Sequence, residues 1–268
     1  MSENNREGKR TARARLQEER RRQESKAKRL RLLTVLGVVV AVLAIAAVVG
    51  VLVSNRGGGD NSASDKPVAT PKGTIGEGRL VIPVGRADAK AALTVYEDFR
   101  CPACGQFEKA FHGTIARLED QGRLRTEYHL VAFIDNNLGG SGSKNAANAA
   151  ACAQDAGAFR EYHDVLYANQ PPETQDAFGN KDTLIRLAQR VPALKGNKAF
   201  EACVDNGTYD GWVKKSQNAF NKSGYTSTPT ILLNGENLNA DQQNPLTPQR
   251  LEQKVDALQK KAPSPTGS

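Results

Sequence analysis

The ten residues VYEDFRCPAC, positions 95–104, decide the fold of this chain, because they join a strand to a helix through two cysteines. The run that contains their first half, residues 92–99, is rich in β-forming side chains and apolar on both faces, which predicts a central strand. Residues 102–121 carry large apolar side chains at helical spacing and predict a helix that Gly122 ends. The two cysteines therefore stand where a strand passes into a helix.

The position of the two cysteines predicts redox chemistry. If Cys101 lies near the N-cap, Pro102 takes the first helical position, where its missing N–H is harmless. The free N–H groups of the first turn and the helix dipole then lower the pKa of Cys101 below the free value of about 8.5. A thiolate is a more populated nucleophile and a better leaving group in disulfide exchange. Cys104, one turn further along, is expected to be the shielded resolving thiol.

Two other interpretations of this cysteine pair remain open at this point. The pair could be half of a zinc site, but such sites usually supply a second close Cys or His pair. The three histidines, His112, His129 and His163, have no ligand spacing and are expected to be ordinary surface or half-buried residues. The pair could also be an inert structural disulfide, although so tight a ring suits a redox role better. We predict a redox-active pair, with no metal and no cofactor.

The other segments of the folded body predict an α/β fold with a helical insertion. Residues 79–84 are predicted as a short edge strand that contains a proline, and residues 124–134 as a strand that completes a βαβ unit. From about 143 to 223, alanine-rich and amphipathic segments predict four or more helices and no strand. A hairpin around the Asn-Gly pair 234–235 follows, and a last helix starts at Thr247.

The composition places the basic charge at one end of the chain. The 268 residues are 39% hydrophobic, 25% charged and 6% aromatic, which excludes a collagen-like, a wholly disordered and a polytopic membrane protein. Residues 1–31 hold twelve of the 37 basic and five of the 29 acidic residues, so nearly all of the net charge of +8 lies there. This basic tail could bind RNA or anionic lipids, but we favour the interpretation that it is a topogenic segment, which sets the orientation of the chain in a membrane.

Residues 32–53 form an uninterrupted uncharged run, LLTVLGVVVAVLAIAAVVGVLV. At about 1.5 Å per residue this run spans a bilayer as one helix, and it is longer than the apolar part of a signal peptide. The basic residues 1–31 are expected to stay in the cytoplasm, which places the body on the outer side of the cell membrane behind a single-pass anchor. Residues 54–74 are expected to be a flexible linker, 75–262 the folded domain and 263–268 a disordered tail.

The other two cysteines, Cys152 and Cys203, both lie in the predicted helical insertion. An extracytoplasmic location permits disulfides. With Cys101 and Cys104 paired locally, the economical choice among the three possible connectivities joins Cys152 to Cys203 as a structural disulfide. A second redox pair that shuttles electrons is the alternative.

Two separated motifs resemble those of DsbA-like thiol–disulfide oxidoreductases of the thioredoxin superfamily. Residues 95–104 are similar to the family signature F-x-D-F-x-C-P-x-C. Residues 227–235, STPTILLNG, are similar to the family's cis-proline segment. The resemblance covers about residues 75–261 and implies a thioredoxin fold with an all-helical insertion over about 139–223.

The resemblance also implies roles for individual residues. Cys101 would be the attacking cysteine and Cys104 its partner, on either side of Pro102 and Ala103. The bond between Thr228 and Pro229 would be cis and packed against the first cysteine, and its backbone would pair with an extended substrate chain. The helical insertion would flank the groove where unfolded chains dock.

The chain also departs from the family pattern. Ala103 stands where the best-known periplasmic members have histidine, so one side-chain donor near the thiolate is missing and the couple is expected to be less oxidising. Val95 stands where many relatives bury an acid. Glu97 could replace that acid as a proton shuttle for Cys104, or it could be a surface carboxylate. Asp98 is expected to cap the helix start or to hold the loop.

The resemblance and the predicted anchor together imply an enzyme that oxidises substrate dithiols to disulfides outside the membrane. Its expected partners are unfolded or reduced secreted proteins and a membrane reoxidase, similar to DsbB or to a vitamin K epoxide reductase. No nucleic acid is expected as a partner. The alternatives are a reductase or isomerase of the same fold, an anchored binding or chaperone module without enzymatic activity, and a zinc-binding domain.

Overall fold

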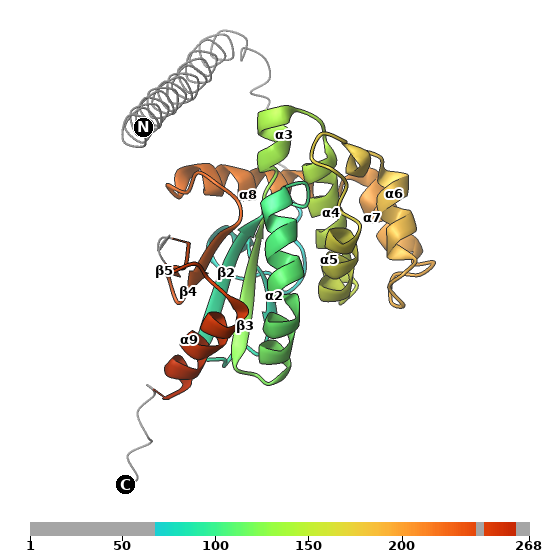
Figure 1. Ribbon diagram of the computed structural model, residues 1–268. Coiled ribbons are helices and arrows are strands. Elements are labelled where there is room, and N and C mark those ends of the chain that lie inside the picture. The colour runs from blue at the N-terminus through green and yellow to red at the C-terminus, as the bar shows by residue number, and fades with distance from the viewer. Residues whose placement is uncertain (1–67, 240–243, 261–268) are drawn as a thin grey trace, which may run out of the picture. The chain divides into compact units, whose positions relative to one another are not determined.

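The computed structural model describes residues 68–239 and 244–260, which form a mixed sheet surrounded by helices (Figure 1). Within these ranges the sheet has five strands in the order β1-β3-β2-β4-β5. Strands β2 and β3 are parallel, and the other neighbouring pairs are antiparallel. The strand bounds are Ile82–Gly85 for β1, Ala91–Glu97 for β2, Leu124–Leu130 for β3, Thr230–Leu233 for β4 and Glu236–Asn237 for β5.

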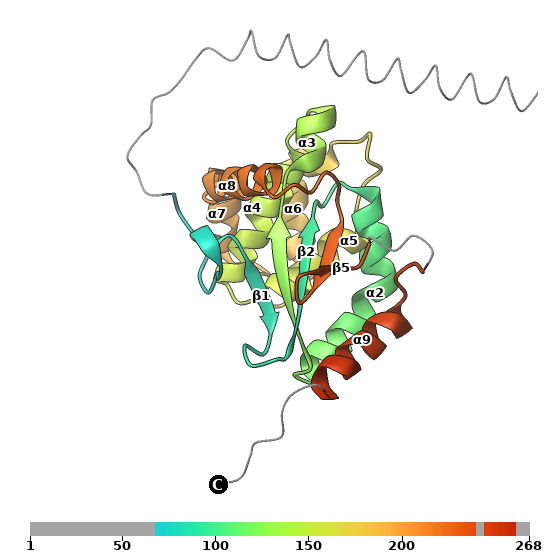
Figure 2. The ribbon, with the colours of Figure 1, turned by 90° about the vertical axis from the view of Figure 1, so that its left-hand side faces the viewer.

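Helices cover both faces of the sheet. Helices α2 (Pro102–Asp120) and α9 (Pro248–Lys260) contact each other and the strands on one face, and α8 (Asp210–Lys222) packs on the other (Figure 2). The remaining elements are η1 (Glu77–Arg79), α3 (Phe133–Leu138), α4 (Gly142–Asp155), α5 (Phe159–Ala168), η2 (Ala177–Gly179), α6 (Lys181–Ala188) and α7 (Lys198–Asn206). A βαβ unit, a set of helices and a ββα unit thus follow one another, with the dithiol motif at the start of α2.

Strand β2 lies at the centre of the sheet because it is apolar on both faces. Leu93 and Val95 are fully buried in the main core. On the other face the ring of Tyr96 stacks on that of His129, with 4.2 Å between the centroids. The same ring contacts Phe220 of α8, 5.6 Å away between centroids. The residues that follow β2 therefore continue from a strand whose two faces are both packed.

Two strands differ from the expected ranges. Strand β1 begins at Ile82 and lies at the edge of the sheet, where a proline interrupts no hydrogen-bond ladder. Strand β3 ends at Leu130, and the chain turns into α3. The Asp98 carboxylate accepts a hydrogen bond from the amide of Ile134 at 2.8 Å and fixes this turn. The prediction of a strand through residue 134 is therefore wrong, and Ile134 packs beside the two cysteines instead.

Helix α4 is the buried centre of the helical insertion. Helices α5, α7 and α8 all contact it. Small side chains on every side let these neighbours approach the backbone of α4. The alanine-rich segment breaks at Gly157, whose φ of +70° suits glycine, so α4 and α5 are separate helices. The fully buried alanines of α4 are Ala146, Ala147, Ala149, Ala150, Ala151 and Ala153.

Residues 68–74, expected to end a flexible linker, lie against the folded body. The amide of Lys72 donates to Asp155 Oδ1 at 2.8 Å, and Gln154 Nε2 donates to the carbonyl oxygen of Lys72 at 3.0 Å. Thr74 is buried. The folded part therefore begins before the expected boundary at Ile75.

The expected tail over 1–31, the expected anchor over 32–53 and the expected C-terminal tail over 263–268 lie outside the described residues. Within residues 68–239 and 244–260, no helix is both long enough and apolar enough to span a bilayer.

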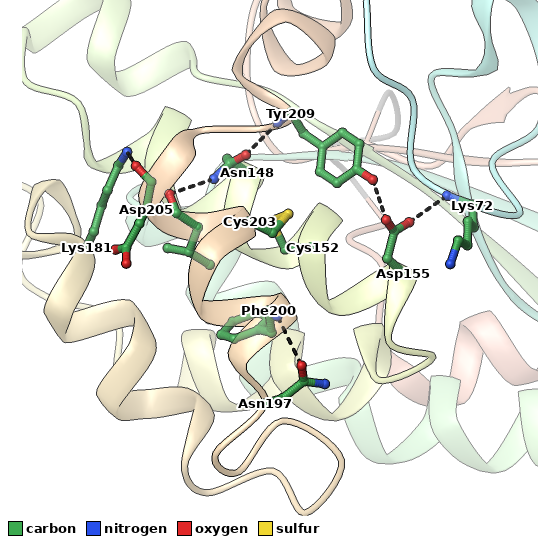
Figure 3. Close-up of a disulfide and its surroundings, with 11 residues drawn as sticks. Lys72, Asn148, Cys152, Asp155, Lys181, Asn197, Phe200, Cys203, Asp205 and Tyr209 are labelled. Atoms are coloured by element: carbon green, nitrogen blue, oxygen red, sulfur yellow. Dashed lines mark hydrogen bonds between the residues drawn. A yellow bond between two sulfur atoms is a disulfide. The ribbon is translucent and has the colours of Figure 1, made fainter.

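A disulfide joins Cys152 of α4 to Cys203 of α7 (Figure 3). It connects residues that are 51 positions apart in the sequence. Asn148, one turn before Cys152, reinforces the link, since its Oδ1 accepts from the amide of Tyr209 at 2.7 Å and its Nδ2 donates to the Val204 carbonyl at 3.5 Å. The disulfide and this amide together hold α7 and the start of α8 to the central helix.

Removing this disulfide is expected to destabilise the protein by about 2–4 kcal/mol, because the bond restricts the unfolded chain over a long loop. Cys152→Ala, Cys203→Ala and the double variant should lose the same free energy of unfolding, since each lacks the bond. Guanidinium unfolding of the three variants and the parent protein measures this. A double variant that loses far more than either single variant would show that packing of the side chains, and not the bond, is responsible.

Candidate active site

Cys101 and Cys104 lie at the N-terminus of α2. Cys101 is the N-cap residue with extended backbone, and Pro102 takes the first helical position, where no N–H is needed. Both cysteines are free thiols in this structure. Cys101 is 6% exposed and lies beside the exposed Pro102, whereas Cys104 is 0% exposed. An incoming group therefore reaches the Cys101 sulfur first.

The two thiols have opposite electrostatic environments. The hydrogen bond from the Cys104 thiol, the Thr228 side chain and the backbone N–H groups of Cys104 and Ala103 together lower the pKa of Cys101 to about 6, although partial burial opposes this. Burial, with the hydrogen bond and charge of Cys101, raises the pKa of Cys104 well above its usual range. At neutral pH Cys101 is a thiolate and Cys104 a thiol. This combination suits an attacking sulfur next to a resolving one.

The ionisation of Cys101 gives a direct prediction. Its pKa in the folded protein lies below that of a free thiol, so the thiolate should be present above about pH 6 and be lost as the pH falls through 6. The ultraviolet absorbance of the thiolate in the reduced protein measures this transition. Cys101→Ser should abolish the transition. A midpoint near the value of a free thiol in the parent protein would contradict the assigned environment.

The Thr228–Pro229 peptide bond lies beside Cys101 and is cis. In its thiol form the Cys101 Sγ donates to the carbonyl oxygen of Thr228 at 3.3 Å. The Thr228 hydroxyl is buried and has no hydrogen-bond partner in the described part of the chain, so it is free to donate to an ionised sulfur. Asn239 Nδ2 donates to the Pro229 carbonyl at 2.9 Å and holds this loop to the residues after β5. The structure thus brings together the two motifs that are more than a hundred residues apart in the sequence.

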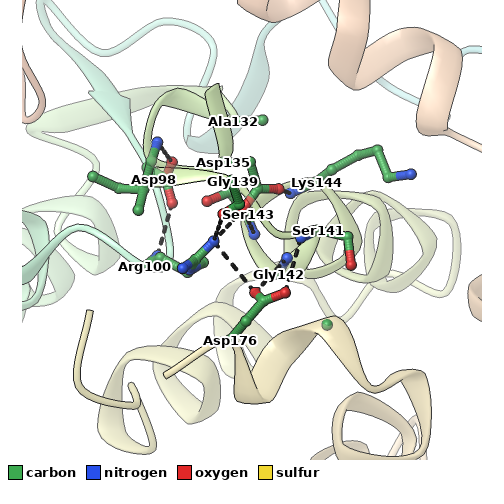
Figure 4. Close-up of polar contacts among 12 residues, drawn as sticks. Asp98, Arg100, Ala132, Asp135, Gly139, Ser141, Gly142, Ser143, Lys144 and Asp176 are labelled. Carbon is green, nitrogen blue, oxygen red and sulfur yellow. Dashed lines mark hydrogen bonds and ion pairs between the residues drawn. The ribbon is translucent and has the colours of Figure 1, made fainter. Parts of the chain in front are cut away.

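Arg100, the residue before the dithiol motif, ties the active-site loop to the helical insertion (Figure 4). Its side chain is 3% exposed, and Nη1 donates to Asp135 Oδ1 at 2.6 Å and to the Gly139 carbonyl at 2.9 Å. Nη2 donates to the Glu173 carbonyl at 3.1 Å, and Nη1 lies 3.3 Å from Asp176 Oδ1. No local pattern in the sequence marks Arg100 for this role, because its partners lie in segments that only the fold brings close.

Asp98 is buried in the protein and stabilises the same active-site loop. Its carboxylate accepts hydrogen bonds from the amides of Arg100 at 2.7 Å and Ile134 at 2.8 Å. Burial raises the pKa of Asp98 to about 7, against the effect of these hydrogen bonds. Holding the loop is one of the two roles predicted for this residue.

Gln170, which follows α5 in the helical insertion, binds the backbone of the active-site loop. Its Nε2 donates to the carbonyl oxygens of Phe99 at 3.0 Å and Cys101 at 2.8 Å. Gly105 makes room for this side chain, since a Cβ at position 105 would collide with Gln170 Oε1. A glutamine in a polar loop has no distinguishing signal in a single sequence, so the role of Gln170 was not predicted.

Glu97 is fully buried at the end of β2 and is not a surface carboxylate. Its Oε1 lies 2.8 Å from Nε2 of His163 on α5. The expectation that every histidine is at the surface or half-buried is wrong for His163, whose side chain is 2% exposed. The sequence did contain a signal, because Phe159, Tyr162 and Leu166 stand at helical spacing around it and indicate a buried face.

A C-x-x-C pair at the start of a helix, packed against a cis-proline that precedes a strand of a mixed sheet, defines a thioredoxin-fold protein with a dithiol site. A family model described as thioredoxin matches residues 79–257. The chain therefore belongs to the thioredoxin family.

The chain is also similar to DsbA-like proteins. "Disulfide bond formation protein D" of Bacillus subtilis (strain 168) is 26% identical over 154 residues, which cover 56% of this chain and 66% of that protein, less than two thirds of its length. Oxidised DsbA of Mycobacterium tuberculosis matches with 29% identity and a TM-score of 0.57, covering 68% of this chain and 94% of that chain. Reduced DsbG of the same organism matches with 29% identity and a TM-score of 0.57, covering 68% and 89%. The predicted thioredoxin-like α/β fold and the resemblance to DsbA-like proteins are confirmed.

Proposed function

We propose that the chain is a thiol–disulfide oxidoreductase that oxidises dithiols of secreted proteins through the Cys101–Cys104 couple. The difference between the two sulfurs carries this proposal: one is a thiolate at the mouth of the site, and the other is a buried thiol. A stabilised thiolate favours the reduced form of the couple, so the disulfide form accepts electrons readily. The similarity to disulfide bond formation protein D and to DsbA supports the direction of the reaction.

The proposed location is the outer side of the cell membrane, with residues 32–53 as a single-pass anchor and residues 1–31 in the cytoplasm. The uncharged run and the basic tail before it support this topology. The proposed partners are reduced or unfolded secreted proteins and a membrane reoxidase of the DsbB or vitamin K epoxide reductase kind. Protease added outside intact cells should remove the domain, and fractionation should leave it with membranes. A domain protected from the protease would contradict this topology.

The redox potential and the activity on a substrate test the function together. Equilibration with glutathione measures the potential of the Cys101–Cys104 couple, and a reduced, unfolded protein with native disulfides measures oxidation. We expect a potential well above the value of about −270 mV that is typical of thioredoxin, together with net disulfide formation. A potential as low as that of thioredoxin without oxidation would indicate a reductase. Correction of wrong disulfides without net oxidation would indicate an isomerase, and protection from aggregation without exchange a chaperone.

A further inference from the structure

Glu97, Glu108 and His163 form a buried cluster of three polar side chains from three elements. Glu97 ends β2, Glu108 lies on α2 and His163 lies on α5. One potential ligand atom of each residue lies within 4.8 Å of those of the other two. Each of the three residues is at most 5% exposed. The cluster therefore joins the sheet, the helix that carries the dithiol motif and the helical insertion inside the protein.

The cluster has more negative charge than its described neighbours balance. Among the ion pairs within residues 68–239 and 244–260, only that of His163 Nε2 with Glu97 Oε1, at 2.8 Å, involves either glutamate. Even a protonated His163 would therefore offset only one of the two carboxylates. Glu97 Oε2 and Glu108 Oε1 are buried and have no hydrogen-bond partner in the same ranges. Because an unpartnered buried charge is strongly destabilising, the cluster needs a further cation or a proton.

His163 is surrounded by aromatic rings and not by solvent. The centroid of its ring lies 5.6 Å from that of Phe99, 4.8 Å from that of Tyr128 and 5.5 Å from that of Phe159. Such a shell lowers the local dielectric constant, which strengthens the attraction between a cation and the carboxylates. A cation with two charges would balance both carboxylates beside a neutral imidazole.

The ligand atoms of the cluster suit zinc. Zinc binds imidazole nitrogen and carboxylate oxygen at about 2.0–2.2 Å, usually with four ligands in a tetrahedron, so its ligand atoms are about 3.4 Å apart. The 2.8 Å between His163 Nε2 and Glu97 Oε1 and the limit of 4.8 Å for the whole set lie on either side of this spacing. Magnesium and calcium prefer ligand sets made of oxygen alone, which a histidine does not supply. Small rotations of the side chains would bring all three ligands to one ion.

The cluster also has an outer partner and a path from solvent. His163 Nδ1 lies 3.5 Å from Asp164 Oδ1, and a carboxylate beside the second ring nitrogen typically orients a metal-binding histidine. Glu108 and Asp164 both line a cavity of about 670 Å³ beside α2. This cavity is large enough for water, so an ion can reach Glu108 and a water molecule can supply the fourth ligand.

We propose that Glu97, Glu108 and His163 bind one zinc ion, with His163 Nε2 and one oxygen of each carboxylate as ligands. The ion replaces the proton between His163 and Glu97 and balances the charge of both carboxylates. It holds α5 of the insertion to β2 and α2, so its role is structural. Neither Cys101 nor Cys104 is a ligand, which separates this site from the zinc site considered for the cysteine pair. The inference goes beyond the proposed function and does not depend on it.

Two other states of the cluster compete with a bound zinc ion. The ion occupies the Glu97 carboxylate, so zinc binding and the proton shuttle expected for Glu97 exclude each other. A proton that stays on Glu108 is the other way to remove the excess charge. Whether the metal-free protein takes up zinc distinguishes the bound ion from both.

Zinc titration of the full-length chain, purified in detergent without a polyhistidine tag, tests the proposal. A chelator first removes bound metal, and oxidation then joins Cys101 to Cys104, so that neither sulfur binds zinc. Since Cys152 and Cys203 are also joined, the three histidines are the only remaining imidazole or thiolate ligands among the 268 residues. Titration calorimetry with zinc chloride measures the number of ions bound and their affinity.

The parent protein should bind one equivalent of zinc with a dissociation constant below about 1 µM, as structural zinc sites do. Glu97→Gln and His163→Gln should weaken this binding by at least about 100-fold, because each removes a ligand and loss of an outer partner alone weakens binding by about 10- to 100-fold. Added zinc should raise the unfolding temperature of the parent protein but not that of these two variants.

Three variants outside the cluster are matched controls. His129 is a histidine of β3, and His112 of α2 is an exposed histidine whose Nδ1 lies 3.2 Å from Asp164 Oδ1. Glu119 is a second buried glutamate of α2, and it lies 3.5 Å from Arg160. His129→Gln, His112→Gln and Glu119→Gln should each bind one equivalent of zinc as tightly as the parent protein.

Three results would overturn the proposal. A parent protein that takes up no zinc would leave a proton as the balancing charge. Zinc binding that is lost in His112→Gln and kept in His163→Gln would assign the ion to the exposed pair of His112 and Asp164. Calcium that displaces zinc at equal concentration would contradict a site with an imidazole ligand. None of these measurements uses oxidase activity, so failure of the proposed function would leave the result intact.

A further variant keeps the inference testable if Glu97→Gln and His163→Gln do not fold. The side chain of Glu108 borders the cavity, and Glu108→Gln preserves its size while it removes the charge. This variant should bind zinc at least about 10-fold more weakly than Glu119→Gln. A folded Glu108→Gln protein with the zinc affinity of the parent would overturn the site.

Discussion

Cys101→Ser is expected to lower the rate at which reduced substrate proteins are oxidised by at least about three orders of magnitude, as is usual when a nucleophile is removed. The reason is that the Cys101 sulfur is the more accessible of the two, and its pKa of about 6 makes it the thiolate. Oxidation of a reduced, unfolded protein in a glutathione-free buffer measures the loss. The unfolding transition of the reduced variant should match that of the reduced parent protein, which excludes a folding defect.

Cys104→Ser supplies the matched comparison for this prediction. It keeps the attacking sulfur but lacks the thiol that resolves a mixed disulfide, so covalent complexes between Cys101 and substrate proteins should accumulate. Non-reducing electrophoresis detects such complexes. If Cys104→Ser remained active and Cys101→Ser formed the trapped complexes, the roles of the two sulfurs would be exchanged.

The largest loss of stability is expected for Arg100→Met. The guanidinium is 3% exposed and contacts Asp135 and Asp176, and removing it leaves a buried carboxylate without its cation. Breaking a buried ion pair from one side destabilises a protein by about 3–5 kcal/mol. Guanidinium unfolding measures the change. Because Arg100 connects the active-site loop to the insertion, the oxidation rate should fall as well.

Two further variants separate the charge effect from simple loss of a side chain. Arg86→Met removes an arginine whose ion pair with Asp88 is exposed, and the free energy of unfolding should hardly change. Asp135→Asn in the Arg100→Met background removes the uncompensated charge and should recover part of the stability. A double variant less stable than Arg100→Met alone would show that the network is held by hydrogen bonds to Asp135 and not by charge.

Local patterns in the sequence explain why the overall arrangement was predictable. The β-rich run before Cys101 and the helical run after it placed the thiols at a helix N-terminus, where the structure has them. The Asn-Gly pair predicted a tight turn, and Asn234 and Gly235 both have positive φ values of 48° and 84°. Each of these signals comes from residues that are close together in the chain.

The features that the sequence did not reveal depend on residues far apart. Arg100 and the Glu173 carbonyl that it binds are 73 positions apart, and His163 and Glu97 are 66 apart. No local pattern predicts such contacts, because they depend on how the helical insertion packs against the sheet. The wrong strand end after Leu130 has the same origin, since the Asp98 carboxylate turns the chain from 36 residues away.

Main-chain carbonyl groups accept the hydrogen bonds that two side chains donate around the dithiol site. Gln170 binds the carbonyls of Phe99 and Cys101, and Arg100 binds that of Glu173. Every amino acid has a carbonyl group, so the side chain at position 173 can vary during evolution without loss of its hydrogen bond. Position 173 is therefore expected to tolerate replacement, whereas Arg100 and Gln170 supply the donors and cannot be replaced without losing these hydrogen bonds.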